Sequence, residues 1–302
     1  MIVDEVLDYL NKNSKINTNF INQIKNSVSV KVQNIADYLY MINTKEIWDF
    51  KSDFTGIAPT WENFTIEWKN PPYSISDEEG RNVLEKCRTL SIISDVTKND
   101  INKIPPSDSL YIKTKFILNF THFMYLEKVG YLEMIGTSIW FIDNYGNIIM
   151  QQLKEGKALM PKALNKDAFN NIILTDEQKS LLLKELCETG DRMCLLTIKF
   201  ANCKNIVHRE NNLDEGIIHQ RKRKNKFPIT KYYTLEIDGK TKDKVNLENK
   251  GLWTNSLHIC RGHFKNYTSD APLFGHYVGT VWCPMHTKGT EYSGKVIKDY
   301  KI

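Results

Sequence analysis

The sequence lacks several features that would identify its class directly. Only 6 of its 302 residues are cysteine, and they are widely spaced, which excludes the disulfide framework of a small secreted protein. No stretch approaches the roughly 18 uninterrupted apolar residues of a membrane span, and the acidic N-terminus lacks the basic and apolar regions of a secretory signal. We expect a globular cytoplasmic protein with no membrane contact.

The motifs of several large enzyme classes are also missing. The chain contains no Gly-x-x-x-x-Gly-Lys-Ser/Thr loop, no Gly-x-Gly-x-x-Gly, no His-Glu-x-x-His and no Gly-x-Ser-x-Gly. These absences disfavour nucleotide-dependent chemistry, serine hydrolysis and zinc-protease chemistry. The last third of the chain has no carboxylate cluster, which argues against a two-metal nuclease.

The charges of the chain are unevenly distributed. Residues 1–190 carry 21 Lys and Arg against 25 Asp and Glu, a net charge of −4, whereas residues 191–302 carry 20 against 11, a net charge of +9. A basic segment of this kind is the electrostatic pattern expected for a polyanionic partner. A solvated basic face without a partner explains it equally well.

The hydrophobic pattern predicts an α+β fold, with a mainly helical region over residues 1–100 and a sheet-centred domain over residues 101–302. Apolar residues at three- and four-residue steps favour a helix over 18–40. Ser76 followed by Glu79 resembles a capping box, so we expect a second helix over 77–93.

Beyond residue 110, aromatic and β-branched residues predict mostly antiparallel strands. The segment 143–147 is a hairpin signal. A short helix is expected over 176–187 and a buried strand over Cys194–Phe200. His122 lies in an aromatic strand pattern, where a hydrogen-bonded core histidine is the usual finding.

A run of basic residues stands out at 220–226, where five of seven residues are positively charged. Strand-like alternation follows over 230–237, so we expect the run to form a hairpin arm or the loop before that strand. Its cations would contact phosphates, and a tyrosine would offer a stacking face to a base. The predicted nucleic-acid-binding residues are Arg221, Lys222, Arg223, Lys224, Lys226, Tyr232 and Lys265. A charged tip that only keeps the protein soluble is the alternative.

The densest group of reactive residue types lies between His258 and Gly289. If 257–264 is one strand, its alternation places His258, Cys260 and Gly262 on one side and Arg261 and His263 on the other.

One family resemblance rests on this stretch. The pattern His258-x-x-Arg261-Gly262-His263-Phe264, followed by Leu273-Phe274-Gly275, Gly279, Trp282 and His286-x-Lys288-Gly289, resembles a family of uncharacterised proteins common in phages and other bacterial mobile elements. The segments 57–68, 200–206 and 232–237 resemble other parts of the same family. The resemblance implies a biological setting and supplies no mechanism.

Three functions are compatible with these residues. The first is a metal-independent ribonuclease in the style of small bacterial toxin nucleases. Its base would be His263, its acid His286 or His258, and Arg261 would clamp the phosphate. Lys265 or Lys288 would add positive charge.

The second function is zinc binding, as an alternative to having no cofactor. Cys260 and His263 form one Cys-x2-His pair, and Cys283 and His286 form another, with nineteen residues between the two pairs. Pro284 between the second pair and the strand-like flanking sequence argue against zinc.

The third function is a module that binds nucleic acid, RNA in preference, or a host or cognate protein without catalysis. In that case the same cations contact phosphates, and Trp282 fills the core or stacks on a base. We favour RNA binding with cleavage over this alternative.

Overall fold

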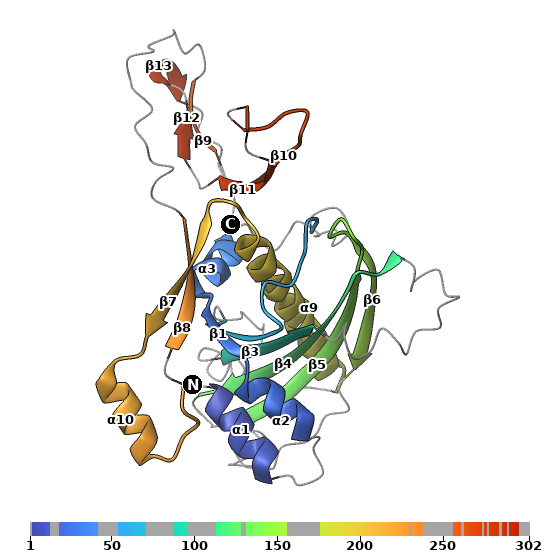
Figure 1. The fold of residues 1–302 in the computed structure, drawn as a ribbon, viewed down its shortest axis with the longest axis vertical. Helices are drawn as coiled ribbons and strands as arrows, with labels where there is room; N and C mark the ends of the chain where they lie inside the picture. The colour runs from blue at the N-terminus through green and yellow to red at the C-terminus, as the bar shows by residue number, and fades with distance from the viewer. Residues whose placement is uncertain are drawn as a thin grey trace. The chain divides into compact units, whose positions relative to one another are not determined.

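The computed structural model of the chain (Figure 1) divides it into two compact units. Unit 1 consists of residues 1–199 and 208–235, and unit 2 of residues 200–207 and 236–302. The structure describes residues 2–12, 18–41, 54–70, 87–95, 113–127, 131–155, 176–229, 231–237, 256–260, 263–273, 275–276, 278–283, 286–288 and 290–295. None of the helices in these segments is long and apolar enough to cross a membrane.

Eight of the described strands form one mixed sheet in the order β6-β5-β4-β3-β2-β1-β8-β7. Five of them form an antiparallel meander. They are β2 (Asn63–Lys69), β3 (Cys87–Asp95), β4 (Phe116–Leu126), β5 (Tyr131–Ile142) and β6 (Ile148–Glu155). The turn between β5 and β6 is the hairpin predicted at 143–147, and Gly146 has a φ of +80° there.

The predicted fold class is wrong, because strands of the first hundred residues belong to the central sheet. The helix predicted over 18–40 is interrupted by β1 (Val28–Lys31), which separates α2 (Thr18–Lys25) from α3 (Gln33–Met41). β1 lies between β2 and β8 (Lys231–Ile237) and is parallel to both. The four residues of β1 also fit the helical spacing of apolar residues. They form a strand because the two neighbouring strands offer backbone hydrogen-bond partners that only an extended backbone can reach.

The second N-terminal helix that the sequence predicts is also not formed where the chain is described. Residues 77–86 lie outside the described residues, and 87–93 belong to β3. β3 is buried between β2 and β4 along its length, so its apolar residues need no alternation.

One face of the sheet is covered by α1 (Ile2–Lys12) and α2 (Figure 1). The aliphatic side chains of α1 pack on Leu90, Ile92 and Phe123 of the sheet. The buried residues of α1 are Ile2, Val3, Val6, Leu7 and Leu10. Each contributes about 1.5–3 kcal/mol on burial, so hydrophobic contact determines where α1 docks.

The other face of the sheet contacts α9 (Asp176–Ala201), where His122 of β4 is hydrogen-bonded to Asp191. This helix corrects two predictions. It continues past residue 187, and Cys194–Phe200, predicted to be a strand, lies near its C-terminal end. All side chains from Met193 to Ala201 are buried, and a helix that is apolar all round cannot be distinguished from a buried strand by periodicity.

The first part of the basic run, residues 220–223, is the end of a helix, and residues 224–226 form the turn that follows it, which corrects the hairpin arm or loop predicted for the whole run. β7 (Ile206–Asn212) leads into α10 (Glu215–Arg223). Asp214 caps this helix by accepting hydrogen bonds from the backbone of Gly216 and Ile217. Basic residues fill the last turn of α10, where they interact favourably with the helix dipole.

Unit 2 is built from short strands. They are β9 (Ser256–Cys260), β10 (His263–Tyr267), β11 (Gly279–Cys283), β12 (His286–Lys288) and β13 (Thr290–Lys295). Its aromatic centre joins Phe200, Phe264 and Trp282, whose ring centroids lie 4.8–4.9 Å apart. The Asn205 amide donates to the backbone oxygen of Trp282 at 2.8 Å and accepts from its backbone nitrogen at 2.9 Å. Trp282 is therefore a core residue, as the sequence indicates.

Candidate functional site

A cleft of about 680 Å³ lies in unit 1. Its walls come from α1, α10, the strands β1, β2 and β8, and the start of β3. Basic residues outnumber acidic ones along it. The basic lining residues are Lys31, Lys69, Arg88, Arg221, Lys224 and Lys226, and the acidic ones are Asp4, Glu5 and Glu67.

Two residues of the predicted nucleic-acid-binding set serve mainly to attach α10 to α1. The Arg221 guanidinium donates to both carboxylate oxygens of Asp4, at 2.8 and 2.9 Å, and to the backbone oxygen of Phe227 at 2.7 Å. The side chains of Asp4 and Arg221 are 5% and 11% exposed. A bidentate pair this well buried holds both partners in place, so Arg221 is a structural residue.

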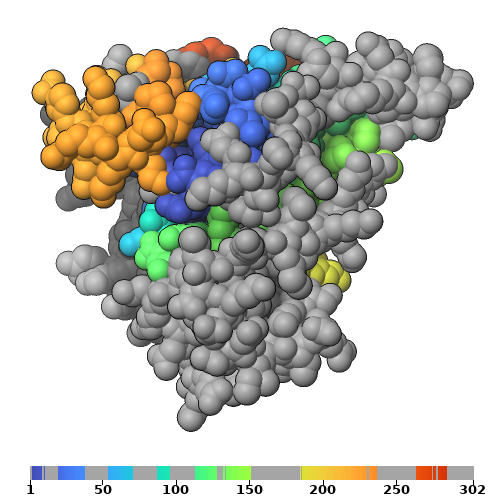
Figure 2. Space-filling view, turned by 90° about the horizontal axis from the view of Figure 1, so that it is seen from below, coloured from blue at the N-terminus to red at the C-terminus, as the bar shows by residue number. Residues whose placement is uncertain are grey.

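Lys226 makes the second attachment. Its ammonium donates to Asp8 at 2.7 Å and lies 3.8 Å from Glu5. The hydrogen bond to Asp8 raises the pKa of Lys226, against the smaller opposing effect of burial. Lys226 is therefore charged throughout the physiological range and neutralised locally by acidic residues. Figure 2 shows the result, with the orange α10 segment beside the blue N-terminal elements.

Four basic residues of the cleft remain. Arg88 is paired with Glu67 and with Glu127, whereas the other three are in a different situation. Lys31, Lys69 and Lys224 are exposed, and among the described residues none of their side chains is paired with a carboxylate. The ammonium of Lys31 lies 3.6 Å from the centre of the Tyr232 ring, which is close enough for a cation–π interaction. Tyr232 itself lines the cleft. The cleft thus presents three available ammonium groups, one of them beside the ring of Tyr232.

α10 extends this positive surface. Lys222 and Arg223 are exposed in its last turn, next to the cleft residue Lys224. These three residues are consecutive in the sequence, so a polyanion that contacted the cleft at Lys224 would also contact the end of the helix.

Sequence reasoning identified Lys224 and Tyr232 but missed Lys31 and Lys69. Each of the two missed lysines is the last residue of its strand, with no other basic residue beside it. They join the site because β1 lies between β2 and β8. Strand alternation around Val28–Lys31 is the only local signal that could have found them.

The described residues that were predicted to be catalytic lie in two sheets of unit 2, the β10–β11 pair and the three-stranded β12-β9-β13 sheet. His263 of β10 is the cross-strand partner of Cys283 in β11. In the neighbouring pair of strands, His286 is the partner of Cys260, and Lys288 is the partner of His258. The two predicted acid–base histidines, His263 and His286, are therefore not directly opposite one another.

Two further predicted residues of unit 2 have different outcomes. Arg261, the predicted phosphate clamp, lies outside the described residues. Lys265 is exposed in β10, and its ammonium lies 4.9 Å from the Tyr267 ring centre. Of the single strand predicted over 257–264, residues 257–260 lie in β9 and 263–264 in β10, and residues 261–262 lie outside the described residues.

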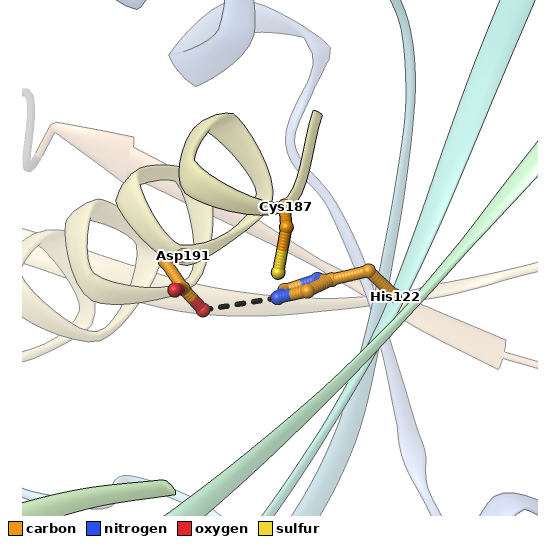
Figure 3. A group of neighbouring side chains, drawn as sticks. All are labelled: His122, Cys187 and Asp191. Carbon is orange, nitrogen blue, oxygen red and sulfur yellow. Dashed lines mark hydrogen bonds and ion pairs between the residues drawn. The ribbon is translucent and has the colours of Figure 1, made fainter. Parts of the chain in front are cut away.

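A buried polar chain links three strands to α9. Each ring nitrogen of His122 has a hydrogen-bond partner. Nδ1 lies 2.6 Å from Ser91 Oγ. Nε2 lies 3.0 Å from Asp191 Oδ1 (Figure 3). Ser138 donates to the same Asp191 oxygen, and Trp140 Nε1 donates to Ser138 at 3.0 Å. His122 is thus a satisfied core histidine, as predicted.

The composition of this chain resembles a serine-hydrolase triad, but the groups cannot reach a substrate. Ser91, His122 and Asp191 are each 0% exposed. Gly190 explains the close packing, because a Cβ at this position would lie 2.6 Å from His122 Nδ1. We therefore assign the chain a structural role, which is to hold α9 on the sheet.

Cys187 lies beside this chain and completes a group of three ligand-type side chains with His122 and Asp191 (Figure 3). Burial raises the pKa of Cys187 to about 12, and the nearby Asp191 adds to the rise. A protonated thiol binds metals poorly, and both nitrogens of His122 are already hydrogen-bonded. These residues do not form an open metal site.

Comparisons of the chain with protein-family models, with curated proteins and with solved structures give no match. The resemblance to a phage and mobile-element family therefore stays a prediction from the sequence.

Proposed function

We propose that the protein binds single-stranded RNA through the cleft of unit 1. The observation that carries the proposal is the grouping of Lys31, Lys69 and Lys224, which have no carboxylate partner among the described residues, around Tyr232 in one cleft.

The charge arrangement suits a phosphate backbone. Exposed lysines neutralise phosphates without the cost of burying their own charge. Arg221 and Lys226 are already neutralised by α1, so they shape the wall of the cleft and leave phosphate contact to the three lysines and to Lys222 and Arg223. Several cations along one surface favour a polymer over a single small anion.

The aromatic ring favours an unpaired strand. A base stacks on an aromatic side chain only when it is not paired and stacked within a duplex. Tyr232 is half-buried, and its ring lies under Lys31, so a base on Tyr232 would have a phosphate-binding cation beside it.

The test compares two triple variants with equal loss of charge. Lys31→Gln, Lys69→Gln and Lys224→Gln together remove the cleft cations. Lys25→Gln, Lys115→Gln and Lys184→Gln remove three exposed lysines that do not line the cleft. Binding of a fluorescent single-stranded RNA of mixed sequence is measured by anisotropy. We expect the cleft triple to weaken binding at least about tenfold and the control triple to change it less than about twofold.

Equal losses in both triples would show that only net charge matters and would overturn the cleft as the site. Tyr232→Ala adds an independent reading, because loss of a stacked base costs about 1–3 kcal/mol. A single-stranded DNA of the same sequence that competes as well as the RNA would overturn RNA as the partner class.

Cleavage of RNA by His263 and His286 stays a prediction from the sequence. RNA recovered after incubation and run on a gel tests it. RNA shortened by the wild type and left intact by His263→Ala would support cleavage, whereas intact RNA with both proteins would leave the protein as a binding module.

A further inference from the structure

We propose that the outer face of the β10–β11 pair in unit 2 is a second contact surface for single-stranded RNA. The surface is formed by Lys204, Lys265 and Tyr267, which all belong to unit 2. None of these three residues lines the cleft of unit 1, so the inference does not depend on RNA binding by the cleft.

The strand register gives the β10–β11 pair an inner and an outer face. Phe264 lies opposite Trp282, and their rings pack together in the aromatic centre of unit 2. Successive residues of a strand point to opposite sides, so His263, Lys265 and Tyr267 share the outer face. On that face His263 and Lys265 are exposed and Tyr267 is half-buried.

The outer face combines a cation with an aromatic ring. The ammonium of Lys265 lies 4.9 Å from the centre of the Tyr267 ring, which is within the range of a cation–π interaction. The cleft has the same combination, where the ammonium of Lys31 lies 3.6 Å from the centre of the Tyr232 ring. Each unit therefore presents a half-buried tyrosine with an ammonium group beside its ring.

A second cation, Lys204, lies against the strand opposite Tyr267. Gly279 is the cross-strand partner of Tyr267, and a Cβ at Gly279 would lie 3.0 Å from Cε and 3.2 Å from Cγ of Lys204. The aliphatic part of the Lys204 side chain thus occupies space that a larger residue would need. The backbone nitrogen of Lys204 donates to the backbone oxygen of Thr280 at 2.9 Å, which holds this lysine beside β11.

The charges of this surface favour an anionic partner. Lys204 and Lys265 are exposed, and among the residues that the structure describes no carboxylate pairs with either ammonium group. Asp270 is the one acidic residue in the sequence from 263 to 283. The two lysines are therefore available to phosphates.

The aromatic ring favours a single strand of nucleic acid over an acidic protein segment. An unpaired base can stack on Tyr267 while its neighbouring phosphates contact the lysines. An acidic peptide would use the two cations and leave the ring without a matching group.

The experiment counts the oligonucleotides that the full chain binds. A single-stranded RNA of about six nucleotides, a length that one such site accommodates, is titrated into the protein at low salt in a calorimeter. We expect the wild type to bind two. The double variant Lys204→Gln with Lys265→Gln should bind one, and so should the cleft triple variant at residues 31, 69 and 224. Lys25→Gln with Lys115→Gln removes two exposed lysines outside both surfaces and should still bind two.

The counts separate this proposal from the one for the cleft. One site in the wild type that the double variant loses and the cleft triple keeps would support the second surface and overturn the cleft. One site that the cleft triple loses and the double variant keeps would overturn the second surface alone. Two sites retained in the double variant, an equal loss in the lysine control or no binding at all would overturn the second surface as well.

Tyr267 tests the stacking contact in the cleft triple variant, where the second surface is the remaining site. Tyr267→Ala should weaken RNA binding about fivefold to 150-fold, the range for loss of one stacked base. Tyr267→Phe keeps the ring and should bind as tightly as Tyr267, and an equal loss in both variants would contradict stacking. A poly-glutamate peptide of equal charge that displaces the RNA as well as unlabelled RNA does would overturn nucleic acid as the partner.

Discussion

Individual residues in this protein show that burial and pairing, more than residue type, determine a role. His122 has the residue partners of a catalytic histidine and is fully buried. Arg221 has the residue type of a phosphate clamp and is held by Asp4. In both cases a residue whose type suggests a catalytic or binding role is already hydrogen-bonded within the fold, so it contributes to stability.

The first prediction concerns the buried carboxylate of Asp191. Asp191→Ala leaves His122 and Ser138 without their partner in a site with no solvent, so we expect a loss of about 3–5 kcal/mol in the free energy of unfolding. Glu188→Ala on the same helix, whose carboxylate is 37% exposed and 3.8 Å from Arg192, should cost less than about 0.5 kcal/mol. Urea unfolding followed by tryptophan fluorescence measures both, and equal losses would contradict the structural role of the chain.

At the scale of a single element, local hydrogen bonds to a carboxylate stabilise the fold, and their contribution to stability can be measured through its dependence on pH. The β5–β6 turn depends on Asp143, whose carboxylate accepts from the backbone of Tyr145 and Asn147 at 2.8 Å each and from the Asn147 side chain at 3.0 Å. Burial alone would raise the pKa of Asp143, but these hydrogen bonds outweigh it and lower the pKa from its ordinary value. The ionised carboxylate therefore stabilises the turn.

The second prediction follows from that direction. Because the pKa of Asp143 is lower in the folded state, its contribution is fully present above the unfolded pKa of about 3.9 and is lost as the pH falls through the folded value. Asp143→Asn should cost about 1 kcal/mol at neutral pH and progressively less below about pH 4. Asn144→Ala, in the same turn and exposed, is the control. A cost that does not change with pH, measured by thermal unfolding, would contradict the role of the charge.

At the scale of the whole molecule, the charges that line the cleft differ from the net charges of the sequence blocks that supply them. The net charge of +9 over residues 191–302 includes Arg221 and Lys226, which the acidic α1 neutralises. Conversely, Lys31 and Lys69 come from the acidic part of the chain and add to the positive cleft. The net charges of the sequence blocks therefore do not give the charge of the cleft, which takes lysines from both parts of the chain.

The third prediction is a salt dependence of RNA binding. For single strands the slope of log K against log salt is about −0.7 for each neutralised phosphate. If the three cleft lysines each contact one phosphate, the triple variant at residues 31, 69 and 224 should reduce the magnitude of the slope by about 2. Titrations at several salt concentrations test this, and an unchanged slope would mean that these lysines do not contact phosphates.

The sequence by itself determined the parts of the protein that are stabilised by interactions between residues close together in the chain. The turn at 143–147, the strand at β8 and the core positions of His122 and Trp282 follow from turn chemistry and alternation, and the structure has them. The Cys-x2-His pairs are also visible in the sequence.

Only the tertiary structure decided the rest, because it depends on partners distant in the chain. β1 is a strand because β2 and β8 flank it, and 194–200 is helical although its apolar residues suit either form. Arg221 of α10 is bound to Asp4, more than two hundred residues away in the chain. The register that opposes Cys260 to His286 likewise comes from strand pairing, which no spacing along the chain specifies.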